Sequence, residues 1–167
     1  LLFVPGLLQT EDYARAVITS GHPQRATPDD ERRIAVRMRR QQLIGRRDAP
    51  TLWAILDESV LHRPIGGPAA LIRQVERLLE LSTLPNVVVQ ILPFPLSGYA
   101  AESSFSILRF AEPELPDLVY QEHLTAAQFL DKRPEVEIYS RAMDRVAVDA
   151  LTPDETRQYL TKLVAEQ

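Results

Sequence analysis

The segment Val87–Leu92 (VVVQIL) constrains the fold most, because β-branched residues occupy both of its faces. A second strand is predicted over Thr51–Asp57, where both faces are again mostly apolar, as expected of a covered strand. Between them, residues 69–84 carry apolar side chains at helical spacing. This order of strand, helix and strand predicts two parallel strands joined by a right-handed crossover.

The rest of the chain surrounds this unit with helices and further strands. Threonines at positions 10, 27 and 152 are good N-caps, and helices are predicted to follow them and to span residues 135–150. Strands are predicted at residues 104–110, 117–122 and 127–130, and their connections are too short for crossovers, so they should be antiparallel. We therefore predict an α+β fold, with a mixed, mainly antiparallel sheet of four to five strands and about five helices packed on it.

The length of 167 residues predicts a single domain. Its parts would be a helical entry over residues 1–47, a sheet with one crossover helix over 51–130, and C-terminal helices over 133–167. The sequence starts at Leu1 without a charged leader, and we expect part of a longer cytoplasmic protein. No apolar run approaches the roughly 20 residues of a membrane helix, and we expect no contact with membranes.

Composition argues against most catalytic and metal sites. The chain has no cysteine, which excludes disulfides, thiolate metal sites and cysteine nucleophiles. His22, His62 and His123 lack the spacing of metal-ligand pairs, and no phosphate loop or nucleophile elbow is present. We therefore expect no enzyme activity, no metal and no cofactor. The net charge of −4 disfavours a free-standing nucleic-acid-binding protein.

Arginine is concentrated near the N-terminus. Residues 25–47 hold eight arginines and three acidic residues, a local charge of +5, so that the rest of the chain carries −9. Arg33, Arg37 and Arg40 fall on one helical face. This face is a candidate for contact with DNA phosphates or with an acidic partner. The alternative is a solvated helix whose arginines pair with the chain's own acidic residues.

A second candidate site is a ligand pocket. Glu58 and Glu122 each follow a predicted strand, and two carboxylates that converge at a pocket mouth bind a cation or share a proton. The loop over residues 93–103 is longer than a usual hairpin connection. The lining would be aromatic and acidic: Trp53, Glu58, Phe94, Tyr99, Tyr120 and Glu122. The alternatives are solvated strand-end carboxylates and an apolar loop packed on the core. An enzyme that uses Glu58, Glu122 and His123 is a third hypothesis.

Several motifs carry a resemblance to a known family. The most specific is VPGLLQTEDYARAVI at Val4–Ile18. The others are RMRRQQLI (Arg37–Ile44), ILDESVLHRPIGG (Ile55–Gly67), LPNVVVQILPF (Leu84–Phe94), SFSILRF (Ser104–Phe110) and LVYQEHL (Leu118–Leu124). Together they resemble the uncharacterised C-terminal domain of actinobacterial Xre-type helix-turn-helix regulators, which are described as antitoxin-like.

This resemblance implies a regulatory domain rather than an enzyme. In that family a DNA-binding helix-turn-helix precedes the domain, so DNA would be contacted through a segment outside this sequence. The implied partners are a second copy of the chain, in a homodimer, and a small protein encoded by a neighbouring gene. The family has no catalytic residues to carry over. Tyr99 stands where relatives tend to have histidine.

Overall fold

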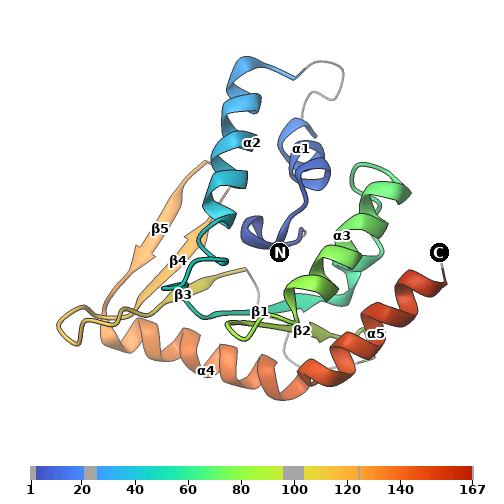
Figure 1. Ribbon diagram of the computed structural model, residues 1–167. Helices are drawn as coiled ribbons and strands as arrows, with labels where there is room; N and C mark the ends of the chain where they lie inside the picture. Colours follow the sequence, from blue (N-terminus) through green and yellow to red (C-terminus); the bar gives the residue numbers. More distant parts are fainter. Residues whose placement is uncertain (1–2, 21–25, 96–103, 124, 167) are drawn as a thin grey trace. The chain divides into compact units, whose positions relative to one another are not determined.

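The computed structural model describes residues 3–20, 26–95, 104–123 and 125–166. Within these ranges the chain forms five α-helices, two short 3-10 helices and five strands, which confirms the predicted α+β class (Figure 1). It divides into two compact units. Unit 1 comprises residues 1–94 and 151–167, and unit 2 comprises residues 95–150.

Unit 1 is built around the predicted strand–helix–strand motif. Strands β1 (Leu52–Asp57) and β2 (Val87–Leu92) are parallel, with Leu52 opposite Val87, and α3 (Pro68–Leu81) connects them. Helix α5 (Pro153–Ala165) packs against β2 and α3. The predicted N-caps are confirmed, since the side chains of Thr27 and Thr152 each close a capping box.

The N-terminal part of unit 1 is held by glutamine side chains. It consists of the 3-10 helix η1 (Gly6–Leu8), α1 (Glu11–Thr19) and α2 (Pro28–Gln41). The fully buried Gln74 of α3 donates from Nε2 to the carbonyl of Leu8 and accepts at Oε1 from the amide of Thr10, both at 2.8 Å. Gln41 of α2 donates to the carbonyls of Gly6 and Gln9. Since η1 has few ladder bonds of its own, these amides satisfy its backbone.

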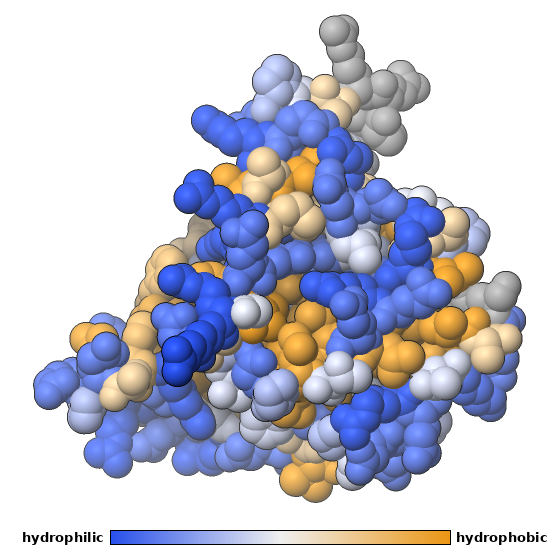
Figure 2. Space-filling view, in the orientation of Figure 1, coloured by the Kyte–Doolittle hydropathy of each residue, from blue (hydrophilic) through white to orange (hydrophobic). Residues whose placement is uncertain are grey.

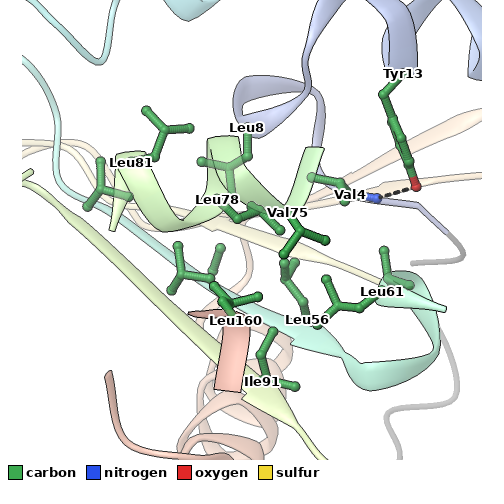
Figure 3. Close-up of a cluster of buried hydrophobic side chains, with 14 of the residues drawn as sticks. Val4, Leu8, Tyr13, Leu56, Leu61, Val75, Leu78, Leu81, Ile91 and Leu160 are labelled. Carbon is green, nitrogen blue, oxygen red and sulfur yellow. Dashed lines mark hydrogen bonds between the residues drawn. The ribbon is translucent and has the colours of Figure 1, made fainter. Parts of the chain in front are cut away.

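The hydrophobic core of unit 1 lies between α3, the two strands and α5 (Figure 3). Leu78 of α3, Ile91 of β2 and Leu160 of α5 are completely buried. At the edge of this cluster the hydroxyl of Tyr13 accepts a hydrogen bond from the amide of Val4 (Figure 3). The PGLLQT motif is therefore part of the core packing.

Gly66 lets two helices approach closely. It has a φ of +76°, and a Cβ at this position would lie 3.1 Å from Cβ of Ala16 in α1 and 3.0 Å from Cβ of Ala70 in α3. Only glycine combines this left-handed backbone with so little space.

Unit 2 is a small antiparallel sheet with one helix. Strands β3 (Ser106–Leu108), β4 (Leu118–Glu122) and β5 (Ala127–Leu130) are ordered β3–β4–β5. Helix α4 (Arg133–Asp149) covers one face, where the Tyr139 hydroxyl donates to Oε1 of Gln121 at 2.9 Å. The predicted antiparallel pairing is confirmed.

Two expectations are corrected. The strands form a two-stranded parallel sheet and a three-stranded antiparallel sheet, where a single sheet of four to five strands was predicted. The short connections after β3 and β4 let these strands pair with their neighbours in sequence, so each sheet forms within its own unit. Strand β1 is covered on one face only, because Trp53 is exposed while Ala54 and Leu56 are buried.

Candidate functional site

Glu58 lies at the end of the parallel strands and is bound by three parts of unit 1. It begins the 3-10 helix η2 (Glu58–Leu61), directly after β1. Its Oε1 accepts a hydrogen bond from the Tyr159 hydroxyl of α5 at 2.6 Å, and its Oε2 accepts from the amide of Phe94 at 2.7 Å. Nε2 of His62 lies 3.5 Å from Oε1 and 3.2 Å from the Tyr159 hydroxyl. We call these four residues the Glu58 cluster.

The electrostatics of the Glu58 cluster favour an ionised carboxylate. Its side chain is only 13% exposed, and burial by itself would raise the pKa. The hydrogen bonds from Tyr159, the Phe94 amide and His62 outweigh this effect and hold the pKa of Glu58 below its ordinary value. Burial, followed by the bond to Glu58, raises the pKa of the Tyr159 hydroxyl well above its usual range. The cluster therefore pairs a neutral phenol with a charged carboxylate.

The structure brings together only part of the predicted ligand pocket. Glu58 and Phe94 are in contact, and the Phe94 ring packs on His62 with a centroid distance of 5.8 Å. Trp53 lies five residues before Glu58, about 16 Å along an extended strand, and its Nε1 donates to Oε1 of Gln90.

The remaining predicted pocket residues are elsewhere. Tyr120 and Glu122 belong to β4 of unit 2, where the Tyr120 ring packs on Phe129 at 5.1 Å. Tyr99 lies outside the described residues. The proposed convergence of Glu58 with Glu122 and His123 joins residues of two units and stays a prediction.

The polar contacts of the Glu58 carboxylate are made largely within the chain. Both carboxylate oxygens already accept from the chain, and surface hollows of about 590 and 450 Å³ are lined by other residues. Among the described residues, no group of three or more histidine, aspartate or glutamate side chains is placed to hold a metal ion. In the same part of the chain, no helix is long and apolar enough to cross a membrane.

Unit 2 presents an apolar sheet face that α4 does not cover. Side chains alternate along each strand, so Val119 and Gln121 face the helix. The opposite face carries apolar and aromatic residues on all three strands: Leu108, Leu118, Tyr120 and Phe129. Phe129 is 60% exposed, and Leu108 is exposed as well. We call these four residues the open sheet face.

The three arginines of the predicted face differ in their surroundings. Arg37 is half-buried and donates from Nη1 to Oε1 of Gln9 at 2.9 Å, so it supports η1. Arg33 and Arg40 are exposed. Their role as a contact surface stays a prediction, while Arg37 is used within the fold.

Comparison with known proteins gives a family. Residues 1–162 match the family described as a domain of unknown function, DUF5753. The chain belongs to this family. No curated protein and no solved structure matches it. The DUF5753 match extends through both units, so the Glu58 cluster and the open sheet face both lie within the domain.

Sequence reasoning missed Tyr159 as a partner of Glu58. The two residues are 101 positions apart in the sequence. From the sequence pattern alone, Tyr159 was predicted only to lie on the buried face of the last helix. His62, four residues after Glu58 on a turn, was the available local signal. In this DUF5753 domain the residues that close the cluster come from α5 and from the end of β2, which only the tertiary fold brings together.

Proposed function

We propose that this DUF5753 domain is the regulatory, partner-binding domain of an antitoxin-like helix-turn-helix transcription regulator, and that it acts in the cytoplasm without chemistry of its own. The observation that supports protein binding is the open sheet face of unit 2. The resemblance of its motifs to Xre-type regulators supports the link to a DNA-binding domain. The partner is a second copy of the chain or a small protein encoded by a neighbouring gene.

The open sheet face has the composition of an interface core. Aromatic residues are enriched in such cores, and a large aromatic side chain contributes 150–250 Å² of contact. The Tyr120 and Phe129 rings already pack on each other and form a firm surface. Moving one exposed Phe from water into an interface contributes about 1.5–3 kcal/mol. None of the four side chains of the open sheet face is charged.

The test compares two exposed apolar residues of unit 2. Phe129→Ser removes the most exposed aromatic ring of the open sheet face, whereas Val148→Ser changes a residue of α4 that is 83% exposed and outside it. We expect Phe129→Ser to weaken association about tenfold or more, because about 1.4 kcal/mol corresponds to a factor of ten. Val148→Ser should bind like the unchanged chain.

The measurement is the molar mass in light scattering, for the chain alone and mixed with the neighbouring gene's product. A chain that stays monomeric at high concentration and ignores that product contradicts the proposal. Equal binding by both variants would place the interface elsewhere. In the whole regulator, partner binding should change operator affinity, and the reverse must also hold, because coupling between two sites is reciprocal.

Within unit 1, the Glu58 carboxylate of the predicted small-molecule pocket accepts hydrogen bonds from the Tyr159 hydroxyl and the Phe94 amide, which favours a structural role for this residue.

A further inference from the structure

Helix α2 and the turn that follows it carry a seven-residue pattern of arginine pairs and apolar residues. Arginine pairs occur at residues 32–33, 39–40 and 46–47, and an apolar residue lies midway between successive pairs, at Val36 and Leu43. Seven residues are nearly two helical turns, so the arginine pairs at 32–33 and 39–40, which both belong to α2, lie on one face about 10 Å apart. The amides of Leu43 and Ile44 donate 3-10-type hydrogen bonds to the carbonyls three residues before them, so the chain keeps turning in the helical sense just after the end of α2.

This face points away from the body of unit 1. Ile34, on the other side of the helix, is buried. Val36 and Leu43 are 51% and 42% exposed, and neither belongs to the core cluster. Residues three and four positions away are neighbours on a helix surface. Val36 is therefore surrounded by four exposed arginines: Arg32, Arg33, Arg39 and Arg40.

Most of this positive charge is not neutralised by the chain. Arg32 pairs with Asp29 at 2.6 Å, and Arg46 lies 3.5 Å from Oδ1 of Asp48. Arg33, Arg39 and Arg40 make no ion pair with the described residues, and from Arg32 to Arg47 the sequence contains no acidic residue. In Figure 2 the region where α2 lies in Figure 1 shows mainly hydrophilic residues with smaller hydrophobic areas among them. Clustered like charges create a strong local potential that attracts the opposite charge.

We infer that this face of α2 is a docking surface for an acidic amphipathic helix of another protein, with apolar residues seven positions apart that contact Val36 and Leu43. Guanidinium groups bind carboxylates through paired hydrogen bonds, so each arginine pair matches acidic residues that flank an apolar one. The surface shares no residue with the open sheet face, and the inference goes beyond the proposed function.

The exposed apolar residues favour a protein partner over nucleic acid. Phosphates would satisfy the arginines but offer nothing to Val36 and Leu43, whereas an apolar centre with an arginine rim is typical of protein interfaces. A second copy is a poorer match, because the exposed face of α4 mixes Glu137 with Arg141, and that of α3 mixes Arg73 with Glu76.

The experiment uses a synthetic helical peptide of about three heptads, with leucines seven residues apart and glutamates around them. Its scrambled version keeps the same charge and composition. The full chain should bind the patterned peptide about tenfold more tightly than the scrambled one, and binding should weaken as salt rises. Val36→Ser should lower the affinity for the patterned peptide about tenfold, while Val148→Ser leaves it unchanged.

Two variants separate this face from basic surface in general. Arg40→Gln should weaken binding severalfold, whereas Arg141→Gln, an exposed arginine of α4 with no ion pair among the described residues, should not. Equal affinity for the patterned and scrambled peptides would overturn the inference, since charge alone would then explain binding. Tighter binding of duplex DNA than of the peptide would overturn it, as would Arg40-dependent self-association. Circular dichroism of each variant checks that the helix content is retained.

Discussion

The two units of this chain differ in how completely they bury their apolar residues. Unit 1 encloses Leu78, Ile91 and Leu160 completely. Among the described residues of unit 2, only Val119 and Val136 are both apolar and buried. Of the ten exposed large hydrophobic residues in the described part of the chain, six belong to unit 2, although it is the smaller unit. Unit 1 therefore has an extensive buried core, while unit 2 leaves much of its apolar surface exposed.

The polar contacts differ in the same direction. In unit 1 buried amides bridge separate elements, as Gln74 does between α3 and the PGLLQT segment. In the described part of unit 2, the Tyr139 hydroxyl of the helix donates a hydrogen bond to Gln121 of the sheet. A three-stranded sheet with one helix is near the lower limit of independent stability. Unit 1 therefore combines the larger buried core with more polar bridges between its elements, while unit 2 keeps more of its apolar side chains exposed.

The largest expected effect is the loss of a core side chain in unit 1. Leu78→Ala should lower the free energy of unfolding by about 2–5 kcal/mol, because it removes a fully buried leucine and leaves a cavity. Val148→Ala, at an exposed position of unit 2, should change it by less than about 0.5 kcal/mol. Urea unfolding at neutral pH measures both. Similar losses in the two variants would break the contrast between the units.

The next largest effect should follow from Gln74. Gln74→Met keeps the volume and removes both hydrogen bonds, which leaves the Thr10 amide and the Leu8 carbonyl without partners in the interior. Each unsatisfied group costs about 1–3 kcal/mol, so the variant should lose about 2–4 kcal/mol. Hydrogen exchange of the amide of Thr10 should accelerate. Unchanged stability would mean that the PGLLQT segment does not depend on α3.

Sequence patterns predicted the local elements well, because their signals are local. The capping boxes at Thr27 and Thr152 mark helix starts within four residues, and Ala127–Leu130 forms a strand with the predicted limits. The parallel pairing of β1 with β2 follows from the crossover length.

The contacts between distant elements could not be predicted in this way. The arginine pattern indicated that Arg37 faces outward, but the Gln9 amide lies 28 positions away and draws its guanidinium inward. Likewise, the division of the strands into two sheets depends on which edges meet in space, and alternation of side chains does not encode it.

The Glu58 cluster should have a moderate effect with a characteristic pH dependence. Glu58→Gln keeps the shape but removes the charge that strengthens the bonds from Tyr159 and the Phe94 amide, and the free energy of unfolding at pH 7 should fall by about 1–2 kcal/mol. The pKa of Glu58 is lower in the folded chain than in the unfolded one, so its contribution is present at neutral pH and is lost as the pH falls through the folded pKa.

Urea unfolding at several values of pH checks this behaviour. The difference between Glu58→Gln and the unchanged chain should shrink as the pH falls below about 4, the ordinary range of a glutamate, and should vanish once the pH lies below the lowered pKa of the folded state. Tyr159→Phe gives a matched comparison, because it removes one donor and leaves the Phe94 amide bond intact. A difference that stays constant from pH 7 to pH 3 would show that the charge of Glu58 does not stabilise unit 1.

The smallest expected effect on the free energy of unfolding is that of Phe129→Ser in the open sheet face. Phe129 is exposed in the folded chain, so Phe129→Ser removes little buried area and should change the free energy of unfolding by no more than about 0.5–1 kcal/mol. The same substitution should weaken association about tenfold, as argued above for a ring that is buried only by a partner. Measuring unfolding at low protein concentration, where the chain is monomeric, separates the two effects. A large loss of monomer stability would mean that Phe129 supports the fold of unit 2 itself, and the open sheet face would then not be an interface.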